Sequence, residues 1–231
     1  MNFLKTIFSI TNDNNHKIWC VLGIKIKFKY TKKNNNLYLH KINGKVLKNP
    51  KIKGLNVKFL GRNAIVKIFE PYKFIDSEIH VYDNAYIEIG ATKYQYNKLF
   101  INADYSTNFN CKFGKNISCG ELTIRSAAGY NIKIQVGEEC AFSTGCLIQP
   151  LDGHFIIDTS TKKVLNQENT GIRLGNHCWL GRDVKISKNV SISDNIIVGM
   201  GAIVTKSFPE SNIIIAGVPA KIIKRNVDWK R

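Results

Sequence analysis

Acidic residues and long apolar runs are both scarce in this sequence. Its 17 Asp and Glu stand against 34 Lys and Arg. No apolar stretch approaches the roughly 20 residues that span a bilayer, and the N-terminus lacks a long apolar core with a small-residue cleavage site. These absences argue against a transmembrane helix and a secretory signal, so we expect a cytoplasmic protein. Because 44% of the residues are hydrophobic, wholesale disorder is not expected either.

The shortage of acidic residues leaves a formal net charge of +17, which is unevenly spread. Residues 1–70 hold fourteen Lys and one Arg against Asp13 and Glu70, so this part alone supplies +13. Such a surface favours polyanions, for example an acidic glycan, an anionic membrane or a phosphorylated cofactor, although a solvated basic face explains it equally well. No zinc finger, RNA-binding signature or helix-turn-helix accompanies the charge, so we expect no nucleic-acid partner.

Written in sixes from Leu174, the chain repeats itself as LGNHCW, LGRDVK, ISKNVS, ISDNII, VGMGAI and VTKSFP. The first residue of each hexad is aliphatic, the second is small or hydroxylated, and the fifth is apolar. Neither an amphipathic helix nor a half-buried strand has this period. A short strand followed by a corner fits: the first and fifth residues face inward, and the small second residue permits the turn. Stacked coils of this kind share one core, so we predict an all-β solenoid.

The six cysteines include no CxxC pair, which argues against a zinc ribbon and a thioredoxin-like site. Cys140, Cys146 and Cys178 all occupy the fifth position of a hexad. We interpret these thiols as packing residues rather than nucleophiles, because a thiol that faces a core stays protonated and inert.

The two ends of the chain differ from the repeat. Asn43-Gly44 lies between strand-like flanks and predicts a hairpin, and residues 24–29 (IKIKFK) alternate like a half-buried strand. We therefore predict a small N-terminal cap, a β-helix with one insertion, and a C-terminal tail. The predicted bounds are 1–50 for the cap, 51–209 for the β-helix, 149–171 for the insertion and 210–231 for the tail.

With these hexads, followed by AGVPAKIIK, the sequence resembles the hexapeptide-repeat acyltransferases over residues 52–225, most specifically from Gly171 to Lys224. The resemblance implies a left-handed parallel β-helix with three hexads per coil. It also implies a homotrimer that binds acetyl-CoA in a groove between subunits. The tripeptide DGH, followed by Asp158, Thr161, Asn166 and the motif GNHCWLG, resembles the branch that O-acetylates sugars of capsules, lipopolysaccharides and sialic acids.

The insertion contains the stretch LDGHFIID, with His154 in its middle. A sugar hydroxyl is barely ionised at neutral pH, so its attack on a thioester needs a base, and histidine is suited to that task. The histidine of the corresponding motif is the general base in related enzymes, so the resemblance makes His154 our candidate for direct acetyl transfer. Asp152 is the candidate for orienting its ring, although a residue two positions away equally well turns the loop.

Trp179 ends a hexad and is expected to face outward or to lie along an edge. In the sialic acid O-acetyltransferases that the chain resembles, the matching Trp lines the active site, where its indole N–H has access to the substrate or the developing oxyanion. Cover by a neighbouring subunit explains an outward Trp equally well. We interpret the nearby His177 as structural or substrate-facing rather than catalytic.

The resemblance also implies a cradle for acetyl-CoA. The residues that match cofactor-approaching positions of the family are Gly181, Met200, Gly201 and Thr205. Lys206, Lys221 and Lys224 are the candidates for binding its phosphates. Where the family often has Arg at the last two of these positions, Lys supplies charge without a bidentate fork.

Other functions are weighed against O-acetyl transfer. N-acetylation of a nucleotide-linked amino sugar is the first alternative, and a non-catalytic basic solenoid that binds an anionic glycan is the second. The same fold hosts a zinc carbonic anhydrase whose site needs two histidines five positions apart, and this sequence has no such pair, so we expect no metal. The role of residues 1–50, including peripheral contact with an anionic membrane, stays open.

Overall fold

The computed structural model describes residues 8–13, 16–21, 24–29, 33–126, 128–167 and 171–231. The chain divides into two compact units, Met1–Asn34 and Asn35–Arg231. The first unit contains an antiparallel sheet of the strands β1 (Phe8–Asp13), β2 (His16–Val21) and β3 (Ile24–Lys29). The alternating stretch IKIKFK forms β3, which confirms the predicted strand. Within the described ranges, no helix is long and apolar enough to cross a membrane.

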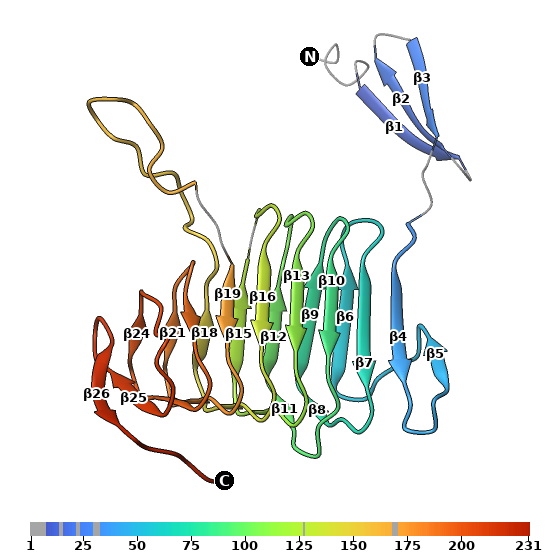
Figure 1. Ribbon diagram of the computed structural model, residues 1–231. Coiled ribbons are helices and arrows are strands. Elements are labelled where there is room, and N and C mark those ends of the chain that lie inside the picture. The colour runs from blue at the N-terminus through green and yellow to red at the C-terminus, as the bar shows by residue number, and fades with distance from the viewer. Residues whose placement is uncertain (1–7, 14–15, 22–23, 30–32, 127, 168–170) are drawn as a thin grey trace. The chain divides into compact units, whose positions relative to one another are not determined.

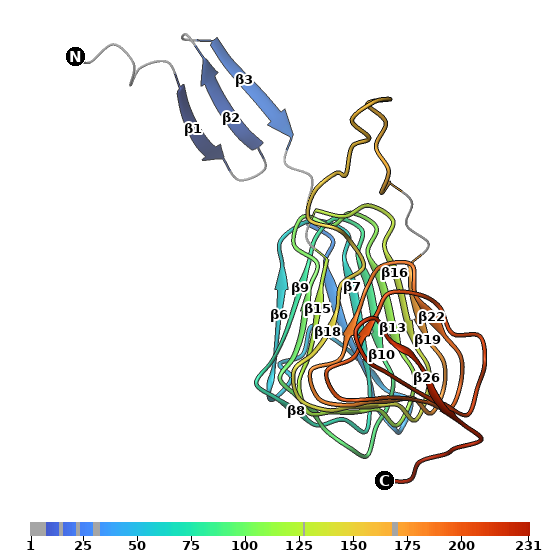
Figure 2. The ribbon, with the colours of Figure 1, turned by 90° about the vertical axis from the view of Figure 1, so that its left-hand side faces the viewer.

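The second unit is a parallel β-helix with three faces (Figures 1 and 2). Face 1 consists of β4 (Asn36–His40), β5 (Val46–Lys48), β7 (Ile65–Phe69), β10 (Tyr86–Ile89), β13 (Asn110–Phe113), β16 (Lys133–Val136), β19 (Ile172–Leu174) and β22 (Ser191–Ile192). Face 2 consists of β8 (Phe74–Ile75), β11 (Tyr96–Asn97), β14 (Ser118–Cys119), β17 (Ala141–Phe142), β20 (Trp179–Leu180), β23 (Ile196–Val198), β25 (Ile213–Ala216) and β26 (Lys221–Arg225). Face 3 consists of β6 (Leu55–Phe59), β9 (Ser77–Val81), β12 (Leu99–Asn102), β15 (Leu122–Arg125), β18 (Cys146–Ile148), β21 (Lys185–Ile186) and β24 (Ile203–Val204).

From β6 to β24 the chain visits the faces in the repeating order 3, 1, 2, so each coil has a corner 1–2, a corner 2–3 and a corner 3–1. The predicted domain bounds shift at both ends. β4 already pairs in parallel with β7, and it forms the predicted Asn43-Gly44 hairpin with β5, so the solenoid unit begins at Asn35 rather than at residue 51. At the other end β25 pairs in parallel with β23, which carries the coils beyond residue 209.

The core of the coils is built from the two hexad positions that the sequence predicts. From Leu174 to Phe208, every first and fifth residue of a hexad is at most 4% exposed. Cys140, Cys146 and Cys178 are among the buried residues. Burial raises the pKa of the Cys146 thiol to about 11, so this side chain is neutral and packs like a small hydrophobe.

The corners are made by the fourth residue of a hexad rather than by the second. Five consecutive fourth residues have a left-handed backbone, with φ between 52° and 70°; they are His177, Asp183, Asn189, Asn195 and Gly201. Asn and Asp are enriched among the non-glycine residues that adopt this conformation. The second residue is small because the next coil is close: a Cβ on Gly137 would lie 2.5 Å from the carbonyl carbon of Gly175. Our prediction that the second residue makes the turn is therefore wrong.

The last residues of the chain run back along corner 1–2 and join several coils. The ring of Trp229 stacks on His177, with 4.4 Å between ring centroids, and its Nε1 donates to the carbonyl oxygen of His177 at 2.9 Å. The guanidinium of Arg231 lies 4.1 Å from the centre of the Tyr94 ring and donates to the carbonyl oxygen of Asn116 at 3.2 Å. The predicted tail is thus a packed segment of the solenoid.

The close approach of the coils predicts which glycines are essential for stability. We expect Gly137→Ala to lower the free energy of unfolding by about 1–3 kcal/mol, because its Cβ meets backbone that has no room to move. The matched control is Gly153→Ala, at which an added Cβ has no heavy atom within 4 Å and the expected change is within about 0.5 kcal/mol. Urea unfolding followed by circular dichroism measures both, and equal stability of the two variants would contradict the packing argument.

Candidate active site

The insertion interrupts the coils at corner 3–1, between the end of β18 at Ile148 and the start of β19 at Ile172. Its described part, up to residue 167, rises from the coils as an arm (Figure 1). An antiparallel bridge joins Ile157 to Val164 within the arm. At the tip, one carboxylate oxygen of Asp158 accepts from the backbone N–H groups of Ser160, at 3.0 Å, and Thr161, at 2.6 Å.

Asp158 and Thr161 therefore have a structural role in this fold. Hydrogen bonds from the Ser160 hydroxyl and from Thr161 hold the pKa of the Asp158 carboxyl at about 2. An ionised carboxylate that accepts several short bonds fixes a turn, as Asp commonly does in loops.

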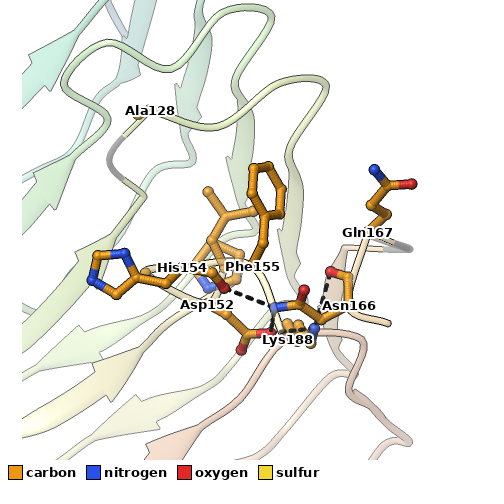
Figure 3. A pocket seen from close by; sticks show the side chains of 10 residues that line it. Ala128, Asp152, His154, Phe155, Asn166, Gln167 and Lys188 are labelled. Atoms are coloured by element: carbon orange, nitrogen blue, oxygen red, sulfur yellow. Dashed lines mark hydrogen bonds and ion pairs between the residues drawn. The ribbon is translucent and has the colours of Figure 1, made fainter. Parts of the chain in front are cut away.

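The base of the arm is closed by the side chain of Asn166 (Figure 3). Its amide Nδ2 donates to the Asp152 carboxylate at 2.7 Å and to the carbonyl oxygen of His154 at 2.9 Å. Its Oδ1 accepts from the backbone N–H of Ile156 at 2.8 Å. One amide group thus joins both sides of the arm around His154.

Lys188, on the next coil at the same corner, adds a charge to this closure. Its Nζ forms an ion pair and hydrogen bond with the Asp152 carboxylate and donates to the carbonyl oxygen of Asn166 at 3.4 Å. The hydrogen bond from Lys188, followed by that from Asn166, lowers the pKa of Asp152 below its ordinary value. The arm is therefore anchored to the solenoid by a charge-assisted contact.

The imidazole of His154 is exposed and points away from this cluster (Figure 3). It contributes to a pocket of about 350 Å³ that is also lined by Ala128, Leu151, Asp152 and Phe155. Among the described residues, no hydrogen bond or ion pair reaches the ring. The structure thus does not bring the Asp152 carboxylate to the imidazole. The carboxylate is instead hydrogen-bonded to Lys188 and Asn166, and through Asn166 it helps to fix the backbone at His154.

A second, smaller pocket of about 240 Å³ continues from the first across face 3. It shares Leu151, Asp152 and Lys188 with the His154 pocket and extends over Lys185 and Ile203. Sequence reasoning missed Lys185 and Lys188, because both are ordinary outward polar residues of the repeat.

None of the predicted acetyl-CoA residues is among the described residues that line this second pocket. Met200 and Gly201 form corner 2–3 of the last coil, and the Met200 side chain is 74% exposed. Ile203 follows on β24, and Thr205 and Lys206 come after it at corner 3–1, where both are exposed.

Three further candidates differ in their surroundings. Gly181 is buried, and a Cβ at this position would lie 2.8 Å from the Met200 nitrogen on the next coil. In a single chain, the missing side chain of Gly181 therefore allows the next coil to pack closely. Lys221 and Lys224 are exposed on β26, which runs antiparallel to β25 at the C-terminal end of face 2.

Trp179 and His177 lie at a different place from His154. Trp179 begins β20 on face 2 and is 40% exposed, and its Nε1 donates to the Ser143 hydroxyl at 3.4 Å. His177 is held by the C-terminal residues: its Nε2 lies 3.1 Å from the carbonyl oxygen of Trp229 and 3.2 Å from the Asp228 carboxylate. Within one chain, no described contact joins either side chain to the His154 pocket.

No protein-family model matches the chain. The sequence is 33% identical over 172 residues, 74% of this chain and 78% of the relative, to a polysialic acid O-acetyltransferase of Neisseria meningitidis. It is 33% identical over 51% of this chain to a polysialic acid O-acetyltransferase of Escherichia coli O1:K1, of which it covers 39%. It is 32% identical over 48% of this chain to the galactoside O-acetyltransferase of Escherichia coli K12, of which it covers 55%. The match thus spans only part of the length of the last two relatives.

Among solved structures, the polySia-specific acetyltransferase NeuO superposes with a TM-score of 0.67 at 27% identity, which covers 85% of this chain and 78% of that one. The solenoid is thus the left-handed parallel β-helix that the resemblance implies. The chain belongs to the hexapeptide-repeat acetyltransferases. Within them it belongs to the branch that contains the polysialic acid O-acetyltransferases.

The anchoring contact predicts a measurable pKa change. We expect Lys188→Met to raise the pKa of Asp152 toward the ordinary Asp value of about 3.9, because the strongest group that favours its ionised form is removed. A depressed native pKa contributes stability above the unfolded pKa and loses it as the pH falls through the native pKa. The base of the arm should therefore open at a higher pH in Lys188→Met than in the unaltered protein.

Carboxyl-carbon NMR titration of Asp152 measures this shift. Lys185→Met is the matched control, because Lys185 lines the same small pocket without a described contact to Asp152. An Asp152 pKa that is unchanged in Lys188→Met, or equally raised in Lys185→Met, would show that the Lys188 contact does not hold the carboxylate.

Proposed function

We propose that the protein is an acetyl-CoA-dependent O-acetyltransferase that acts on a sugar hydroxyl of a bacterial-type surface glycan, such as a capsule, a lipopolysaccharide or a sialic acid polymer. The observation that carries this proposal is the exposed residue His154, which lines a pocket at the long insertion of a hexapeptide-repeat solenoid. Membership of the branch with polysialic acid O-acetyltransferases supports the same reaction.

The chemistry follows from the placement of His154. The imidazole accepts the proton of the sugar hydroxyl while that oxygen attacks the thioester carbonyl, and it returns the proton to the departing thiolate. A base in this role contributes about 10²–10⁴-fold to the rate. Asp152, Asn166 and Lys188 serve this step indirectly, because they fix the backbone on both sides of His154.

Exposed residues at corners 2–3 and 3–1 and on β26 fit acetyl-CoA as co-substrate. Pantetheine is a thin amide chain, and the exposed corner at Met200 and Gly201 offers backbone groups for it. The exposed cations Lys206, Lys221 and Lys224 suit its phosphates. The pocket over Ile203 shares Leu151, Asp152 and Lys188 with the His154 pocket, which supports a thioester placed near the base of the arm.

We infer further that the working form is a homotrimer whose active sites lie between subunits. Within one chain His154 is at corner 3–1 and Trp179 is on face 2, so a site that uses both needs two copies. The arm also exposes large apolar side chains, which favours cover by another copy. These side chains are Phe155, Ile156, Ile157 and Leu165, and each is at least 54% exposed.

The basic N-terminal part favours an acidic acceptor, since residues 1–70 supply +13 of the net charge of +17. Contact with an anionic membrane stays a prediction.

His154→Asn should lower kcat/KM for glycan acetylation by about 10²–10⁴-fold, because the neutral amide accepts no proton. Its thermal unfolding should match the unaltered protein, because the side chain is exposed. Thiol release from acetyl-CoA measures the rate, and mild alkali distinguishes the O-ester product from the amide that the amino-sugar alternative would give. Unchanged acetylation would remove His154 from the reaction, and glycan binding without any acetyl transfer by the unaltered protein would support the non-catalytic solenoid.

Mixing inactive variants tests the shared site. His154→Asn and Trp179→Ala, each inactive alone, should regain activity when unfolded and refolded together. In a mixed trimer one subunit supplies an intact His154 and its neighbour an intact Trp179, and random mixing leaves about a quarter of the sites complete. Light scattering reports whether the mass is three times the 26.2 kDa of one chain. An active Trp179→Ala variant would place Trp179 outside the site, and a trimer of two inactive variants that gains no activity on mixing would contradict a site shared between subunits.

A further inference from the structure

Corner 3–1 carries a pair of tyrosines, the exposed Tyr105 and the half-buried Tyr82, next to the His154 pocket. Tyr105 is 69% exposed, and its ring centroid lies 5.5 Å from that of Tyr82 on the preceding coil, with 52° between the ring planes. The two rings form a small apolar surface on adjacent coils, and nothing in the mechanism above uses it.

The backbone register connects this pair to the pocket. The backbone N–H of Ala128 donates to the carbonyl oxygen of Asp104 at 2.9 Å, which places Ala128 beside Tyr105 on the following coil. Tyr105 and Ala128 also share the left-handed backbone, with φ of 57° and 58°. Ala128 and His154 both line this pocket (Figure 3). Tyr82, Tyr105 and the pocket are therefore consecutive along the corner, at the coil spacing of about 4.8 Å.

The conformation of Tyr105 is unusual for its residue type. A left-handed backbone is uncommon for a bulky residue and is well tolerated by Asn. Four other residues of the same corner obey this preference and form a ladder of side-chain amide hydrogen bonds; they are Asn63, Asn84, Asn108 and Asn131. Tyr105 adopts the same left-handed backbone without being Asn, and its ring is exposed and adds no core packing.

An aromatic pair of this kind suits the face of a sugar ring. The face of an aromatic ring carries partial negative charge, which attracts the C–H bonds of a pyranose, and the phenol oxygens are hydrogen-bond partners for hydroxyl groups. The Asn84 and Asn108 amides at the same corner add donors and acceptors. Apolar faces combined with a few polar groups are the usual composition of small-ligand sites.

We propose that Tyr82 and Tyr105 form a subsite that stacks the sugar units next to the one acetylated at His154. This inference rests on the proposed function and makes it more specific: the acceptor is an oligosaccharide or polymer that lies along corner 3–1. A monosaccharide or a nucleotide sugar reaches the pocket without contacting the pair.

The test is Tyr105→Asn, assayed with sialic acid oligomers of one to six units and with a neutral oligosaccharide series. We expect kcat/KM for the long acceptor to fall about tenfold, the value that one stacking contact supports. The kcat/KM for the monomer and the KM for acetyl-CoA should not change. Because Asn is at ease in the left-handed backbone, the variant should be as stable as the unaltered protein or more so, so that unfolding does not explain the loss. Tyr105→Phe, which keeps the ring, should retain most of the preference for long acceptors.

Binding without turnover separates this proposal from the proposed function. Saturation-transfer NMR with the same oligomers should show binding to His154→Asn and weakened binding to Tyr105→Asn. Loss of acetylation in both variants with equal loss for monomer and oligomer would overturn the subsite. So would an altered mass of Tyr105→Asn in light scattering, because the pair would then be an interface between copies. If neither the unaltered protein nor any variant transfers acetyl groups, the proposed function fails. Binding that depends on acceptor length and on Tyr105 would still support the subsite.

Discussion

The close stacking of each coil on the next is the constraint on which the rest of the structure depends. Parallel strands on three faces satisfy their backbone groups across coils, so the second residue of a hexad must be small and the fourth must accept a left-handed backbone. The interior is filled by the first and fifth residues. Chemistry is therefore left to the corners and to whatever interrupts them. The long insertion at corner 3–1 carries His154, and the solenoid supplies Lys188 from the next coil to anchor it.

The C-terminal half of the fold was predictable because its coils keep a strict length. Asn176 bonds to Asp194, 18 residues on, so six-residue periodicity appears directly in the sequence. Upstream, the Asn63–Asn84–Asn108–Asn131 ladder advances by 21, 24 and 23 residues, and the extra residues hide the period. The start of the solenoid was misplaced for a related reason: β4 looks like one arm of a hairpin, and its parallel partner β7 is identified only by the folded register.

The candidate site shows a similar division. A gap in a regular pattern that contains a histidine is visible in the sequence, and the structure puts that histidine at a pocket. The partners of Asp152 were not predictable, because Lys188 lies 36 residues further on and resembles any outward lysine of the repeat. The separation of His154 from Trp179 also required the assignment of strands to faces. The family resemblance identifies candidate site residues, but it does not tell which of them lie close together within one chain.

The C-terminal residues give the molecule a property that stacked repeats usually lack. In a solenoid each repeat contacts only its neighbours, so the end of the stack is free to unravel one turn at a time. Here Arg231 donates to Asn116, 115 residues earlier, and Trp229 packs on His177 between them. These contacts attach the C-terminal coils to the middle of the stack, and they must break before the last strand can separate. Unravelling from that end becomes a concerted event, and the turns that it protects are those around the pocket.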